Sequence, residues 1–326
     1  MIKQLINPQS ECFDKQTLKK LEPYFDLNFA SANLDEKTQW FNNLLTLAQY
    51  NLGVAHCVHH NATARYVMQL KFNNNMPEFF KNEFAESIGG YSGAKSSDTL
   101  KLNGNKLNGQ KNWISNLHQA DYCISRIKSD DTEIFVLVDM AKLKDSIIFV
   151  NDQLGMEIAT PGSFNAVDYI IPDDHILGHR SLVDNDSTLA GVSNFHGYCF
   201  ITNQLGCIVG LYNMIAETSS KNKFDISHEL SKFKLEISAL KFMWLENIAS
   251  IDESKIDNSF WHKRNTQYNQ SKNILVKLIA LGLEIADSSW TNASGPGNQR
   301  FRDALVFATH MQSLAKGLRD AHFVEF

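Results

Sequence analysis

The sequence is short of several features that would place it in a specialised class of protein. It holds only six prolines and five cysteines in 326 residues, and no two cysteines form a C-x-x-C pair. Because the cysteines are odd in number and scattered, we expect reduced, mostly buried thiols rather than a disulfide framework. Positive charge is not in excess either. The net charge of -5 and the pI of about 6.1 argue against a nucleic-acid-binding protein, which needs a clustered positive field.

Long apolar runs are missing as well. We find no window with the length and apolarity of a membrane span, and the first residues, 1–5, lack the apolar segment of a signal peptide. A cytoplasmic protein without membrane contact is therefore expected. The chain is nevertheless 43% apolar and 21% charged, which is typical of a globular protein of one to three domains.

The hydrophobic pattern changes twice along the chain. Residues 1–83 are expected to be helical, with apolar residues three and four apart in 16–24, 35–50 and 54–70. Residues 84–184 carry short β-branched runs between turn residues, which predicts an antiparallel, barrel-like β domain. Residues 185–326 return to long helical segments, which predict an antiparallel four-helix bundle. These segments are 195–218, 227–251, 265–290 and 299–323. The expected fold class is α+β.

The most informative stretch is residues 107–116. The Asn-Gly pair at 108–109 supplies the positive φ values of a two-residue hairpin turn. The strand after it presents Trp113, Ile114 and Ser115 in succession. An aromatic ring, a branched apolar residue and a hydroxyl together suit the binding of a planar ring system with a polar edge.

This hairpin and three later motifs resemble those of the acyl-CoA dehydrogenase superfamily. The other motifs are the segments 155–163 and 169–178 and the pair Arg302-Asp303. The resemblance covers about residues 45–312. It implies a shortened N-terminal helical domain, a middle β domain and a C-terminal four-helix bundle that joins subunits into a homodimer or homotetramer. It also implies a flavin, FAD or FMN, with Trp113, Ile114 and Ser115 facing the isoalloxazine. The competing interpretation of Trp113 is simple packing between sheet and bundle.

Other residues are assigned to the cofactor by the same resemblance. Gly89 and Gly90, after Ser87, would form a loop beneath the flavin pyrimidine ring, or else a plain helix-to-strand turn. Lys221, close to Phe224, stands where an arginine often reaches the flavin pyrophosphate across a subunit interface. A solvated run of charge is the alternative there.

The resemblance departs from the dehydrogenases at the catalytic base. Their glutamate lies two residues before the proline that precedes Arg-Asp, and that position is Ser294 here. Some members place the glutamate at the start of the first bundle helix, which corresponds to about His196. Two-component flavin monooxygenases of the superfamily lack the glutamate and carry a histidine seven residues after the aspartate, which is His310 here. An imidazole there can exchange a proton with a flavin–oxygen adduct or a phenolic substrate.

We therefore expect a flavin-dependent oxidoreductase that is monooxygenase-like, with His310 as the catalytic residue. It would take reduced flavin from a partner reductase and act on a small molecule. The alternatives are an acyl-CoA dehydrogenase with its base elsewhere, and a non-catalytic scaffold that has lost its flavin. His310 could also be an ordinary core residue of its helix.

Two further groups receive structural interpretations. His56, His59 and His60 share one helix face at a spacing that could bind a metal. Because no other ligand type is placed nearby, we interpret them as surface or interface histidines and expect no metal. Arg302 and Asp303 are interpreted as an internal ion pair that fixes the last helix.

Overall fold

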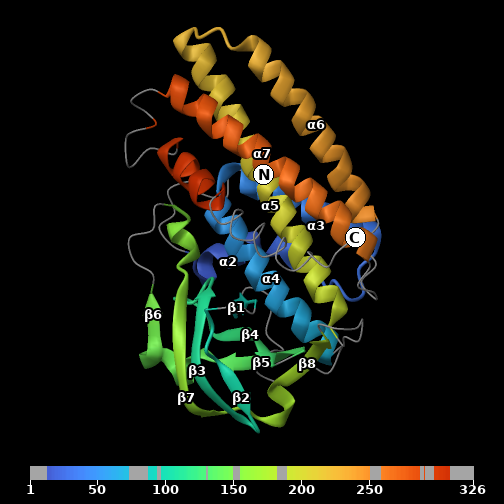
Figure 1. Ribbon diagram of the computed structural model, residues 1–326, viewed down its shortest axis with the longest axis vertical. Coiled ribbons are helices and arrows are strands. Elements are labelled where there is room, and N and C mark those ends of the chain that lie inside the picture. The colour runs from blue at the N-terminus through green and yellow to red at the C-terminus, as the bar shows by residue number, and fades with distance from the viewer. Residues whose placement is uncertain are drawn as a thin grey trace.

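The computed structural model describes residues 13–72, 87–93, 97–129, 131–149, 155–181, 189–249, 258–286, 290 and 297–308. Helices occupy one end of the molecule and two sheets the other, and α4 reaches from the helices to the sheets (Figure 1). The order along the chain is helical, β and helical, as expected. The expected domain boundaries at 83–84 and 184–185 fall outside the described residues.

Three helices open the described chain: α2 (Lys15–Phe25), α3 (Leu34–Tyr50) and α4 (Leu52–Phe72). Helix α3 begins with a capping box, in which the Asn33 side chain accepts from the Glu36 backbone N–H and the Glu36 carboxylate accepts from that of Asn33. Its predicted apolar face is confirmed, because Phe41, Leu44, Leu45 and Leu47 are all buried.

The middle of the chain forms two four-stranded sheets. The first has the order β1-β4-β5-β8 and the second β2-β3-β7-β6. The strands of the first sheet are β1 (Gly89–Ser92), β4 (Tyr122–Ser129), β5 (Thr132–Asp139) and β8 (Ile176–Ser181). Those of the second are β2 (Lys101–Asn103), β3 (Lys106–Ile114), β7 (Gly162–Ile170) and β6 (Ile147–Phe149).

The expectation of an antiparallel domain is wrong at one edge. Strand β1 pairs with β4 in parallel, with Gly89 opposite Tyr122, whereas the other pairings are antiparallel. The parallel pair arises because β1 and β4 belong to the same sheet while the chain between them forms β2 and β3 of the other.

The C-terminal part is helical, with α5 (Ala190–Asn222), α6 (Ser227–Ala249), α7 (Asn258–Ile285) and a further helical stretch over 297–308. Helix α7 begins seven residues before the predicted start at 265. The predicted fourth helix, 299–323, is described only as far as residue 308. Helix α5 packs against α3, α4 and α7, so it joins the N-terminal helices to the bundle.

Helix α5 also corrects the expectation about apolar runs. Its residues 191–222 are long and apolar enough to cross a membrane, but 83% of the apolar window is buried inside the protein. Burial of that kind is typical of the central helix of a globular core. The four described cysteines, Cys57, Cys123, Cys199 and Cys207, are buried thiols without disulfides, as predicted.

Candidate functional site

The end of β3 has an unusual backbone at the predicted flavin wall. The register with β7 shifts between Lys111 and Ile114, and Trp113 lies in the left-handed region with a φ of 57°. A bulky residue at positive φ is uncommon and occurs mostly at functional or strained sites. The left-handed turn exposes half of the Trp113 side chain, 50%, although the next two residues are buried.

The three side chains of the predicted wall enter three different environments. Trp113 faces outward, while Ile114 packs into the apolar core between the sheets. Ser115 is buried, and its Oγ lies 3.1 Å from Nε2 of His56 on α4. Ile114 can therefore offer a cofactor only its backbone, whereas the Trp113 ring and the Ser115 hydroxyl are the groups of this stretch that suit a flavin.

The residue after Ser115 ties this strand end to its surroundings. The Asn116 side-chain amide donates to the Cys57 carbonyl at 2.9 Å and to the Gly89 carbonyl at 3.3 Å. The Asn116 backbone N–H donates to the carbonyl of Ala159. Helix α4, strand β1 and the end of β3 are thereby held in one fixed arrangement.

Gly89 and Gly90 correct the sequence interpretation, because they form part of a buried strand and not a loop or a turn. The Gly89 N–H is already bonded to the Asn61 side-chain oxygen at 2.7 Å. A Cβ at Gly89 would lie 2.8 Å from Ala64 and Tyr122, so glycine is required by the close approach of α4 to the sheet. Ser87, just before β1, is also buried.

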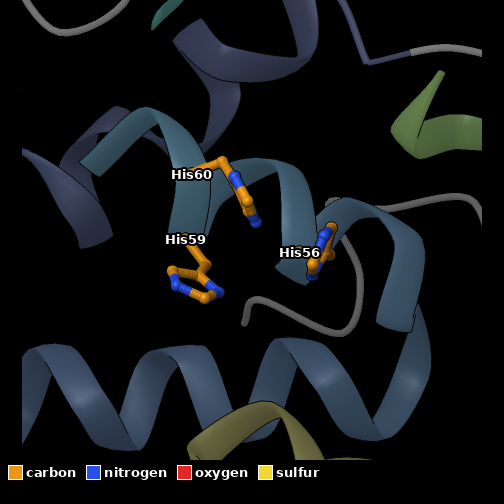
Figure 2. A group of neighbouring side chains, drawn as sticks. All are labelled: His56, His59 and His60. Carbon is orange, nitrogen blue, oxygen red and sulfur yellow. The ribbon is translucent and has the colours of Figure 1, made fainter. Parts of the chain in front are cut away.

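The histidines of α4 give the second correction. His56, His59 and His60 are buried rather than exposed, with 9%, 0% and 8% of their surfaces accessible. Figure 2 shows the three rings gathered on one side of α4. One ring nitrogen of each histidine lies within 4.8 Å of those of the other two. The spacing placed them on one face correctly, but α4 is buried on all sides over most of its length, so that face points inward.

A fourth histidine joins this cluster from α5. Nδ1 of His196 lies 2.8 Å from Nε2 of His59. The His196 ring also lies edge-on to that of His60 and is tilted against that of Tyr91. Nδ1 of His60 lies 2.9 Å from the Tyr91 carbonyl oxygen. We call His56, His59, His60 and His196 the histidine cluster. Through Ser115 it borders the strand end that carries Trp113.

The electrostatics of the cluster keep its centre neutral. The pKa of His59 lies well below its ordinary value, mainly because burial disfavours the charged ring and also because His196 and His60 repel a second positive charge. A histidine with so low a pKa is a weak base.

The remaining predicted cofactor residues lie far from this strand end. Lys221 is exposed at the C-terminal end of α5 and pairs with Glu217 at 2.8 Å, and Phe224 follows it, 47% exposed. The 25 residue steps of helix from His196 to Lys221 span about 37 Å. Lys221 therefore lies at the opposite end of α5 from His196.

The late motif is organised differently from the predicted Arg302–Asp303 pair. Arg302 forms its ion pair with Glu157 at 2.6 Å. Asp303 is buried and accepts hydrogen bonds from the Met156 backbone N–H at 2.6 Å and from the Gln299 side chain at 2.7 Å. Burial raises the pKa of Asp303 to about 6. The motif thus ties the last described helix to segment 155–159, and His310 lies outside the described residues.

Comparisons with known proteins support the fold. No protein-family model and no curated protein matches the sequence. Among solved structures, butyryl-CoA dehydrogenase from Megasphaera elsdenii is similar with a TM-score of 0.74 and 15% identity, covering 95% of this chain and 91% of that one. The HsaA monooxygenase from M. tuberculosis gives 0.72 and 13%, covering 98% and 94%. TdsC from Paenibacillus sp. A11-2, solved with FMN and indole, gives 0.73 and 12%, covering 97% and 93%. The fold is therefore that of the acyl-CoA dehydrogenases and of the flavin monooxygenases that share it.

Proposed function

We propose that this chain is a flavin-dependent oxidoreductase with monooxygenase-like chemistry. The observation that carries the proposal is the buried 3.1 Å contact between His56 and Ser115 at the end of β3. It sets an imidazole against the hydroxyl that the resemblance assigns to the flavin edge. The similarity to both dehydrogenase and monooxygenase structures supports a flavin, FAD or FMN, without deciding between the two chemistries.

Trp113, Ser115 and His310 have different roles in the proposed site. The exposed Trp113 ring offers an apolar face against which a planar ring system can stack. Ser115 offers a hydroxyl whose orientation is set by His56. A bound flavin would supply the electron transfer, and in a monooxygenase the activation of oxygen. His310, which lies outside the described residues, remains the proposed proton donor or acceptor.

The desaturating alternative needs a strong base aimed at the α-carbon of an acyl thioester. Burial, and to a lesser extent the imidazoles of His196 and His60, hold the pKa of His59 well below its ordinary value, so His59 is a weak base. This favours a role in proton exchange with a polar substrate or oxygen over abstraction of a proton from carbon. An acyl-CoA dehydrogenase with its base elsewhere, and a scaffold without flavin, stay as the alternatives.

Flavin binding is the first test. Purified protein is titrated with FAD and FMN, oxidised and reduced, and binding is followed by the visible spectrum and by fluorescence. Trp113→Ala should weaken binding about ten-fold or more, the loss of one stacked ring. The control Phe242→Ala removes another exposed aromatic residue, on α6, and should leave the affinity unchanged. Absence of any flavin binding by the wild-type protein would favour the scaffold.

Turnover separates the two chemistries. Reduced flavin from a generic reductase is supplied with oxygen and a panel of phenolic and heteroaromatic compounds, and oxygenated product is measured. The parallel assay supplies acyl-CoA thioesters with an artificial electron acceptor. Oxygenated product that falls in His310→Ala, with flavin affinity retained, supports the proposal. Acceptor reduction driven by acyl-CoA would overturn the monooxygenase assignment. Light scattering of the same protein tests the proposed homodimer or homotetramer.

A further inference from the structure

The histidine cluster has a composition that folding alone does not call for. His56, His59 and His60 come from successive turns of α4 and His196 from α5, and the α4 rings are almost entirely shielded from solvent. Neutral imidazoles bury less apolar surface than leucine or phenylalanine would, and each ring brings polar atoms that need partners. Four such rings facing one another are, however, the donor set that transition metals prefer.

The hydrogen bond of His60 fixes its proton in a way that suits a ligand. A carbonyl oxygen only accepts, so the 2.9 Å contact with Tyr91 requires the proton on Nδ1 of His60. The lone pair of the neutral ring is then on Nε2. Metal-binding histidines almost always donate their second nitrogen to a carbonyl or carboxylate in this manner, which sets the tautomer and the ring orientation.

Two other members have comparable outer contacts. Nε2 of His56 can donate to the Ser115 hydroxyl at 3.1 Å, which places the lone pair on Nδ1. Nδ1 of His59 lies 3.4 Å from the Asn203 amide. Flipping the Asn203 amide by 180° places its oxygen as the acceptor of a proton on Nδ1 of His59. Nε2 of His59 is then the ligating atom, as in His60.

The distances are near those of a metal site and need only small ring movements. Ligand bonds of about 2.0–2.1 Å allow two nitrogens on one zinc ion to be at most about 4.2 Å apart, and about 3.4 Å apart in a tetrahedron. One nitrogen of each α4 ring lies within 4.8 Å of those of the other two, so the rings must close slightly. The His59–His196 contact of 2.8 Å must open slightly as the ion enters between the two rings, and His196 then carries its proton on Nε2 instead of Nδ1.

We propose that the histidine cluster binds one divalent first-row transition-metal ion, with His56, His59 and His60 as its core ligands and His196 as the fourth. The all-nitrogen set selects ions such as Zn²⁺, Co²⁺, Cu²⁺ or Ni²⁺ over Mg²⁺ and Ca²⁺, which require oxygen ligands. The inference does not depend on the flavin, because its ligands come from α4 and α5 and not from Trp113.

The test uses the full chain without a histidine tag, treated with a chelator and titrated with Zn²⁺ by calorimetry and with Co²⁺ by visible absorption. We expect one ion per chain, ligand-field bands of four-coordinate Co²⁺, and no response to Mg²⁺. His59→Gln and His60→Gln should each weaken binding about ten-fold or more. The matched control His228→Gln, exposed on α6, should bind as the wild type does. Far-UV circular dichroism confirms that each variant is folded.

A measurement on the wild type alone keeps the proposal testable if the variants fail to fold. X-ray absorption at the zinc edge should show nitrogen neighbours at about 2.0–2.1 Å with the outer scattering of imidazole rings. Sulfur neighbours at about 2.3 Å would place the ion on a cysteine and overturn the assignment. It would equally be overturned by folded wild-type protein that binds no ion, or that binds it no more tightly than His59→Gln and His60→Gln do. The cluster would then be a proton-conducting or purely structural one.

Discussion

Two buried polar groups in this molecule are satisfied in opposite ways. Inside the β part, the Lys111 ammonium donates to the Asp98 carboxylate and to the carbonyls of Gly93 and Arg126, each at 2.7–2.8 Å. Beside it, Arg126 forms two hydrogen bonds to Glu133. Each of these two cations faces a carboxylate. In the histidine cluster, by contrast, imidazoles face imidazoles, and burial keeps the central ring, His59, uncharged.

We interpret the Lys111 site as structural and the histidine cluster as a site that is able to bind a ligand. A buried ammonium whose three N–H donors each have an acceptor has no hydrogen-bonding capacity left. A second ion would therefore gain nothing by binding there. The histidine cluster, by contrast, holds its central ring, His59, uncharged, and neutral imidazoles are groups that can bind a cation. The following predictions test this difference in order of expected size.

Removing the Lys111 ammonium should have the largest effect on the free energy of unfolding. Lys111→Met leaves Asp98 as a buried carboxylate without its ammonium partner, and we expect a loss of about 3–5 kcal/mol in the free energy of unfolding. Urea denaturation measures it. The control is Lys106→Met, because Lys106 pairs with Asp168 at 3.6 Å on the surface and should cost under about 0.5 kcal/mol. Equal effects of the two variants would contradict the assignment of Lys111.

Asp303 is a buried carboxyl group whose hydrogen bonds offset only part of the cost of burying its charge. Its pKa is about 6 in the folded protein against an ordinary value of 3.8. Between these two pH values the folded state holds a proton that the unfolded state has lost, so stability falls as the pH rises from about 4 to 6. The fall from this group is about 3 kcal/mol. Asp303→Asn should remove it.

Denaturation curves of the wild type and Asp303→Asn at several pH values from 4 to 7.5 measure this slope. The exposed Asp174→Asn serves as the control and should keep the wild-type profile. A profile of Asp303→Asn that is parallel to that of the wild type would mean that Asp303 titrates at its ordinary pKa despite its burial.

Removing one member of the histidine cluster should cost less. His59→Leu deletes a neutral hydrogen bond to His196, and leucine fills part of the volume. In the presence of a chelator we expect a loss of about 1–2 kcal/mol by urea denaturation. Added Zn²⁺ should then stabilise the wild type and not the variant. A loss as large as that of Lys111→Met would show that the cluster is structural.

The smallest effect is expected at Lys221. Its pairing with Glu217 is exposed on both sides, so Lys221→Met should change the free energy of unfolding of the isolated chain by under about 0.5 kcal/mol. The same variant should weaken flavin binding if the lysine meets a neighbouring subunit's cofactor. Unchanged flavin affinity in the assembled protein would leave Lys221 as a solvated surface charge.

The elements that were predicted correctly are those whose sequence carries a local pattern. Helices α2, α3 and α4 lie within two residues of their predicted limits, because their apolar residues repeat at helical spacing. The parallel pairing of Gly89 with Tyr122 was missed, because a partner 33 residues away leaves no local pattern. The start of α7 was missed because residues 258–264 are mostly polar and show no apolar period.

The candidate site could be predicted only in part from the sequence, again because contacts between distant residues leave no local pattern. The spacing of His56, His59 and His60 showed that they share a face, but not that this face is buried, since α4 has no exposed polar side over its first three turns to reveal the direction. His196 was singled out only as the place of a missing glutamate. Its contact with His59 joins residues 137 positions apart, and only the packing of α5 on α4 brings them together.

The order of the strands has a consequence for how this protein folds. The chain forms β1 in one sheet, β2 and β3 in the other, then β4 and β5 in the first, β6 and β7 in the second, and β8 in the first again. Neither sheet is a continuous piece of sequence, so neither can be excised or assembled alone. We expect the two sheets to appear together in a single cooperative step, after pairings between distant residues have closed several loops.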